Sequence, residues 1–187
     1  MRPSSSSARK TERFPLFDTP AGFDDPLGML LGCHRRIEKK IGTLKRLCAH
    51  LSTKGMDAEA SAAAQAVLRY FDTAGAMHHR DEDHDLFPLL RVRAGELERV
   101  EVAAVIDELE REHHTMEGQW QRLRERLLRV AEGAANLDTE DVTRFAWLYR
   151  RHMEQESAAV MPFAREALRD DEREALGRRM AARRTKA

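Results

Sequence analysis

Four histidines stand at positions where the surrounding pattern calls for an apolar residue, and imidazole is a common metal ligand. They are His34, His78, His113 and His152. Two glutamates each follow one of these histidines by four residues, which gives the pairs His78–Glu82 and His152–Glu156. Residues four apart lie on one face of an α-helix. Each pair can therefore direct two ligand groups to a single point.

The donor types of this set suit a transition metal. Burying six polar groups in a protein core is costly unless each of them finds a partner. Imidazole nitrogens together with carboxylate oxygens suit iron, zinc or manganese. Two carboxylates can bridge two metal ions, each of which is also held by two histidines, as in diiron carboxylate bundles. Spacing alone does not choose the metal, so zinc and manganese stay open beside iron.

A single histidine on an apolar face is more often a hydrogen-bonded core residue than a ligand. The repetition of histidine on four segments, and the two pairs with glutamate, weigh against that alternative here. One rival pair, His79 with Asp83, has the same spacing as His78 with Glu82. The remaining histidines lie off the apolar faces, and we expect them at the surface or around the site: His50, His79, His84 and His114.

Four long amphipathic segments position these side chains. Apolar residues recur at alternating spacings of three and four, which predicts helices packed along one face. The expected helices cover about 24–51, 57–90, 96–131 and 140–168, with breaks at Gly55, Gly95 and Gly133. Proline should bend or end the second helix at Pro88 and distort the fourth at Pro162. The sequence therefore predicts an all-α protein, an up-down-up-down four-helix bundle.

The register of the four helices places the histidines at one height. Counting from each loop to the nearest histidine gives distances that agree to within roughly one helical turn. A random scatter of histidines would rarely produce such agreement, so a shared site in the bundle is expected.

Length and composition agree with one domain. The chain has 187 residues, of which 42% are hydrophobic and 34% charged, typical of a globular fold. We expect a flexible arm over residues 1–20, the bundle over 21–168, and a charged helical tail over 169–187. The tail is rich in arginine around Arg178, Arg179, Arg183 and Arg184. It could contact RNA, lipid or an acidic partner, but solvated charge is the expected state.

Charge and hydropathy exclude several classes. Basic and acidic residues balance at 32 each, so there is no strong signal for nucleic-acid binding. No transmembrane helix is expected, and the Ser-rich N-terminus lacks the apolar core of a secretory signal. A cytoplasmic location is therefore expected. Cys33 and Cys48 lie several turns apart on one expected helix, so both should be reduced and buried.

The sequence resembles the hemerythrin-like, HHE cation-binding family over about residues 24–168. The resemblance lies in LLGCHRRIEKK, HHRDEDHDLFPLL, LEREHHTM and HMEQESAAVMP. Both His–Glu pairs are followed by a proline six residues after the glutamate, and this favours His78–Glu82 over the rival register. The pattern matches the H-HxxxE-H-HxxxE variants of the family.

The resemblance implies a hemerythrin-like bundle around two iron ions bridged by an oxo or hydroxo group. It carries over six ligands, namely His34, His78, Glu82, His113, His152 and Glu156, with the two glutamates bridging. Oxygen-carrying hemerythrins place a second histidine on the third helix, one turn after the first, where this chain has Glu117. Glu117 is then either a carboxylate ligand or an ordinary polar residue. The missing imidazole argues against reversible O2 carriage.

The expected function is that of a non-heme diiron protein that binds or reacts with O2 or peroxide, with catalase-like activity as one form. A second hypothesis is a sensor of iron, O2 or NO that acts through a protein partner, which the sequence does not identify. A third is storage of another divalent metal.

Overall fold

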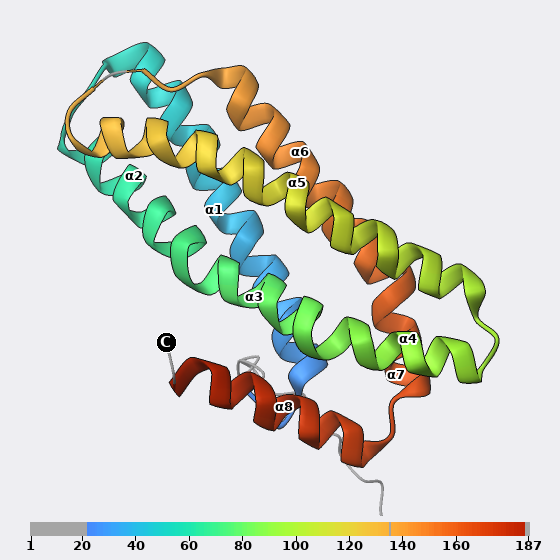
Figure 1. Cartoon of the computed structure of the whole chain (residues 1–187). Coiled ribbons are helices and arrows are strands. Elements are labelled where there is room, and N and C mark those ends of the chain that lie inside the picture. The colour runs from blue at the N-terminus through green and yellow to red at the C-terminus, as the bar shows by residue number, and fades with distance from the viewer. Residues whose placement is uncertain (1–21, 135, 186–187) are drawn as a thin grey trace, which may run out of the picture.

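The computed structural model describes residues 22–134 and 136–185, and every regular element in that part of the chain is a helix (Figure 1). The arm expected over residues 1–20 lies outside the described residues. The elements are α1 (Pro26–Lys54), α2 (Ala58–Tyr70), η1 (Phe71–Gly75), α3 (Ala76–Asp81), η2 (Glu82–Leu86), α4 (Phe87–Glu96), α5 (Val100–Ala131), α6 (Thr139–Gln155), η3 (Glu156–Val160), α7 (Met161–Ala167) and α8 (Asp170–Thr185).

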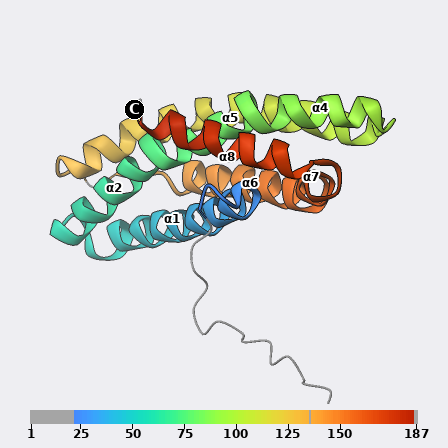
Figure 2. The same ribbon diagram turned by 90° about the horizontal axis from the view of Figure 1, so that it is seen from below.

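These elements form the four-helix bundle that the sequence predicted. α1 and α5 are single rods, α2 to α4 follow one another as a second long helix, and α6 to α7 make the fourth (Figures 1 and 2). The most extensive contacts between the long helices run in the order α1, α2, α5, α6 and back to α1, and α4 also touches α7. The all-α prediction is confirmed.

Acidic residues begin three of the helices. The carboxylate of Asp25 accepts a hydrogen bond from the backbone N–H of Gly28, and Pro26 takes the first helical position, where its missing N–H costs nothing. Asp57 caps α2, and Asp138 caps α6. The N-termini of these three helices are thus fixed by local sequence.

Glu82 and Glu156 each begin a turn of π-helix. The backbone N–H of Phe87 bonds the carbonyl of Glu82, and that of Met161 bonds the carbonyl of Glu156. The next residue is proline in both cases, and proline has no N–H with which to continue the α-helical pattern. Pro88 therefore neither ends nor breaks its helix, which continues through Gly95 to Glu96, and the third long helix begins at Val100 rather than near Glu96.

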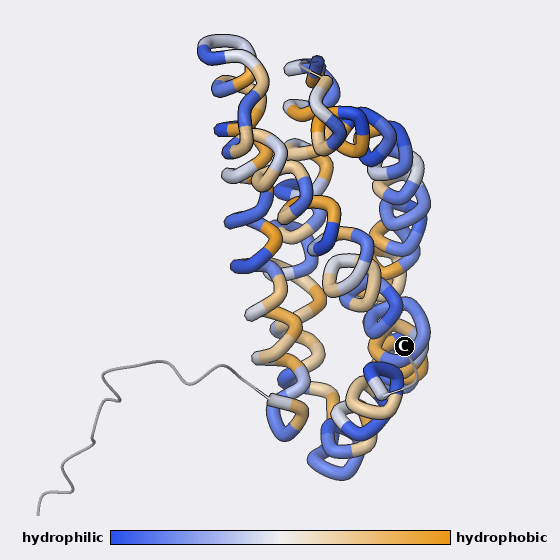
Figure 3. The backbone as a smooth tube through the Cα atoms, turned by 90° about the vertical axis from the view of Figure 1, so that its left-hand side faces the viewer, coloured by the Kyte–Doolittle hydropathy of each residue, from blue (hydrophilic) through white to orange (hydrophobic). Residues whose placement is uncertain are grey.

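The apolar core is divided into two clusters. One includes Ile41, Val67, Leu127 and Phe145 and lies toward the loops that follow α1 and α5. The other includes Leu30, Phe87, Leu109 and Phe163 at the opposite end. Hydrophobic and hydrophilic residues are interspersed along the helices visible in Figure 3. In the first three long helices the buried ligand residues lie between the two clusters in sequence, and in the fourth Glu156 does so, while His152 directly precedes Met153, the last residue of the first cluster.

α8 packs against the bundle, contacting α1 and η2 (Figures 1 and 2). Leu176 and Met180 are fully buried in this contact. The arginines of this segment were expected to be solvated, but Arg183 and Arg184 both bond the carboxylate of Asp81, which has no exposed surface. None of the helices in the described part of the chain has an apolar stretch that could cross a lipid bilayer.

Candidate metal centre

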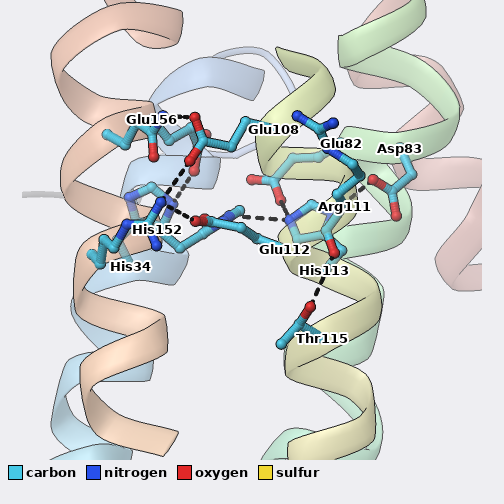
Figure 4. A network of polar contacts seen from close by, with 12 residues as sticks. His34, Glu82, Asp83, Glu108, Arg111, Glu112, His113, Thr115, His152 and Glu156 are labelled. Atoms are coloured by element: carbon cyan, nitrogen blue, oxygen red, sulfur yellow. Dashed lines mark hydrogen bonds and ion pairs between the residues drawn. The ribbon is translucent and has the colours of Figure 1, made fainter. Parts of the chain in front are cut away.

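The four long helices bring the six predicted ligand residues together in the middle of the bundle. His34 comes from α1, His78 and Glu82 from the second long helix, His113 from α5, and the last two from the fourth long helix. Figure 4 shows several of these side chains converging. The six residues are at most 8% exposed: His34, His78, Glu82, His113, His152 and Glu156.

Their ligand atoms form two groups that share one residue. The first group is His34, His78, Glu82 and Glu156. The second is Glu82, His113 and His152. Within each group the candidate ligand atoms lie within 4.8 Å of one another. A carboxylate common to both groups is what a bridge between two metal ions requires.

The two oxygens of Glu82 face different histidines. Oε1 lies 3.2 Å from Nε2 of His78, and Oε2 lies 3.4 Å from Nε2 of His113. Glu156 is placed on the other side of the first group, with Oε2 at 2.8 Å from Nε2 of His34. The second group is closed by the 3.0 Å approach of the Nε2 atoms of His113 and His152.

Much of this set has no hydrogen-bond partner of suitable geometry. Among the described residues, both ring nitrogens of His34 and His78 and both carboxylate oxygens of Glu82 and Glu156 are buried without one. Unsatisfied buried polar atoms are rare in native proteins because each one costs free energy. A bound cation would satisfy one nitrogen of each of these imidazoles together with the carboxylate oxygens, and nitrogen with oxygen donors fits iron, zinc or manganese.

Carboxylates outside the two groups orient the histidines of the second group. Nδ1 of His113 lies 2.7 Å from Asp83, and Nδ1 of His152 lies 3.1 Å from Glu112 (Figure 4). An Nδ1–H that donates to a carboxylate leaves the lone pair on Nε2 free to face a metal. Glu112 is in turn held by Arg151 at 3.0 Å.

Burial shifts the protonation of the site. Desolvation, and next the neighbouring Glu156, raises the pKa of Glu82 well above its usual value. Burial, followed by the neighbouring histidines, holds the pKa of His78 well below normal, and burial with His152 lowers the pKa of His113 to about 2. These imidazoles are neutral, which is the form that binds metal.

Glu117, the remaining predicted ligand, lies apart from both groups. It is exposed, and its carboxylate accepts a hydrogen bond from Gln121. It contributes to the wall of a cavity of about 420 Å³ that also reaches Asp83 and His113. In this structure Glu117 is therefore at the rim of the site.

His79, Asp83 and Glu112 are site residues that the sequence did not assign. His79 was expected at the surface or around the site. Its ring stacks on His113 at 4.1 Å between centroids and faces Tyr149 at 5.6 Å. The HxxxD spacing of His79 and Asp83 was the visible signal, but Asp83 bonds His113. His84 and His114 are exposed, and His50 pairs with Asp57, away from the six ligand residues.

Comparison with known proteins agrees with this geometry. The model of the hemerythrin HHE cation-binding domain matches residues 25–164. The chain belongs to the hemerythrin HHE cation-binding family. It is also 30% identical over 165 residues to an uncharacterized protein of Haemophilus influenzae, a match that covers 88% of this chain and 92% of that protein. The resemblance inferred from the motifs is confirmed, and α8 lies beyond the residues that the HHE domain matches.

Proposed function

We propose that this member of the HHE family is a non-heme diiron protein that binds or reacts with O2 or peroxide. The observation that carries the proposal is the sharing of Glu82 by two buried groups of ligand atoms. A paired metal site of this kind favours chemistry that needs two electrons, since each ion can change charge by one. Two bound iron ions would supply that redox chemistry.

The protein residues would hold and shield the pair. His34, His78 and Glu156 would complete the first position, and His113 with His152 the second, with Glu82 between them. Asp83 would keep His113 in the tautomer that presents Nε2. The apolar clusters on either side would exclude bulk water from the layer of ligands.

Two features support a small exogenous ligand such as O2, peroxide or NO. The second group has three protein side chains against four in the first, which leaves coordination positions for a ligand. The cavity of about 420 Å³ reaches His113 from the surface and provides a path. Because Glu117 stands where oxygen-carrying hemerythrins have a further histidine, reaction rather than reversible carriage is the favoured outcome.

The test is metal content together with optical spectroscopy. We expect two irons per chain after anaerobic loading, a change in the visible spectrum when O2 is added to the reduced protein, and loss of added hydrogen peroxide. Glu82→Gln should lose both metals because it removes the shared charge, whereas Glu117→Gln should keep them.

Each outcome separates the alternatives. A stable adduct with O2 or NO and no turnover would indicate a carrier or sensor. Preference for zinc over iron would indicate storage or structure. Two irons with no spectral response to O2, NO or peroxide would contradict the proposal, and so would a Glu82→Gln variant that binds two irons.

A further inference from the structure

We infer that His79 is an additional nitrogen ligand for the metal position formed by Glu82, His113 and His152. The inference rests on the proposed metal pair and concerns its weaker half. His78 and His79 would then serve different metal ions, one each, from neighbouring positions of the same short helix, α3.

The first argument is the state of its ring nitrogen. Nε2 of His79 is buried and has no hydrogen-bond partner among the described residues. The same condition marks His34, His78, Glu82 and Glu156, which are the whole first group. An imidazole nitrogen buried without a partner costs free energy that a metal ion would recover.

The second argument is position. The ring of His79 lies 4.1 Å from that of His113 and 6.0 Å from that of His152, centroid to centroid. It is therefore beside both histidines of the second group. Glu117 does not compete for this place, because it is exposed and bonded to Gln121.

Ligation by His79 requires its imidazole ring to rotate toward the second metal position. Nε2 of His79 is not among the atoms that lie within 4.8 Å of one another in the second group. His79 and His113 both line the cavity of about 420 Å³, so there is room for the imidazole to turn. The bond to a metal would replace the present stacking on His113, which is a weaker interaction.

The experiment separates ligation from stacking. His79→Phe keeps an aromatic ring against His113 and Tyr149 but offers no nitrogen. His79→Gln keeps polarity and serves if the phenylalanine variant does not fold, as judged by circular dichroism. The matched control is His114→Phe, which changes an exposed histidine on the wall of the same cavity.

Cobalt(II) is the probe. Calorimetry measures its binding, and the intensity of its visible bands reports its coordination number. We expect two cobalt ions in the wild-type chain and in His114→Phe. In the His79 variants the second ion should bind at least about tenfold more weakly, since even the loss of an outer partner costs about 10- to 100-fold in metal affinity. The bands of that ion should also change.

Two cobalt ions bound by His79→Phe or His79→Gln with wild-type affinity and spectrum would overturn the inference and leave His79 as a stacking residue. Failure of the wild-type chain itself to bind two metal ions would overturn the proposed function, and the inference with it. The first failure would be seen in the His79 variants and the second in the wild-type chain, so the two are distinguishable.

Discussion

Asp83 decides which nitrogen His113 offers to a metal, because Oδ1 of Asp83 lies 2.7 Å from Nδ1 of His113 and leaves Nε2 for the metal. We predict that Asp83→Asn lowers the affinity of the second metal position by about 10- to 100-fold while the first changes little. Calorimetric titration of the apoprotein with cobalt(II) measures both. Asp107→Asn, which changes an exposed partner of Arg91, is the control and should match the wild type. Equal affinities in Asp83→Asn would contradict the orienting role.

The two tyrosines give a second test at the scale of residues. Burial raises the pKa of Tyr70 to about 12 and that of Tyr149 further. In the unfolded chain both phenols titrate near their usual value of about 10. The contribution of the two tyrosines to the free energy of unfolding is therefore fully present below pH 10. It declines as the pH rises above that value, because the phenols of the unfolded chain lose their protons before those of the folded chain.

We predict that the native protein shows little phenolate at pH 10.5, whereas the same protein in denaturant titrates both tyrosines near pH 10. Absorbance at 295 nm follows the ionisation, and circular dichroism confirms that the fold persists. A native titration curve that coincides with the denatured one would show that the two phenols are not buried in solution.

α8 is the element whose role is easiest to test. Asp81 has no exposed surface and is held by Arg183 at 2.5 Å and Arg184 at 2.6 Å. We predict that the double variant Arg183→Ala, Arg184→Ala loses about 3 kcal/mol or more of unfolding free energy, since it leaves a buried carboxylate without a partner. Denaturant unfolding measures the loss.

The control for this change is Arg178→Ala on the same helix. Arg178 and Glu174 form an exposed pair, and such pairs contribute about 0–1 kcal/mol. Adding Asp81→Asn to the double variant should restore part of the stability by removing the buried charge. A double variant as stable as the wild type would mean that α8 is not docked in solution.

Local pattern was sufficient to predict the four long helices and the shared height of the histidines, because the three-four spacing of apolar residues fixes which face each histidine occupies. It did not predict the π-turns at Glu82 and Glu156. The proline signal was visible, but proline alone does not determine whether a helix bends, ends or shifts its hydrogen bonds. The docking of α8 was hidden because its composition is dominated by charge.

In the candidate site, too, the sequence predicted the pairs within one helix but not the contacts between helices. His78 with Glu82 was visible within one helix, since both residues lie on one face. The contacts of Asp83 with His113 and of Glu112 with His152 join different helices, and they depend on how closely those helices approach. The apolar pattern does not select His79, which lies off the apolar face, although its ring packs against His113 and Tyr149 of neighbouring helices.

On the scale of the whole molecule, the layer of ligand residues contains buried polar atoms without partners, which a bound cation would stabilise. We predict that metal-loaded protein melts at a higher temperature than protein treated with chelator. At free metal 100 times the dissociation constant, the gain is about 2.7 kcal/mol per site. Differential scanning calorimetry of the two forms measures it. Glu82→Gln should melt at one temperature with or without metal, and identical melting of both wild-type forms would contradict the prediction.

The divided core also bears on how this sequence can change in evolution. Leu30 and Leu127 belong to different apolar clusters, so volume lost at one cannot be refilled by a larger side chain beside the other. Compensating substitutions should then arise within one end of the bundle and not across the ligand layer. In homologous chains, the core residues at one end of the bundle can therefore change independently of those at the other end.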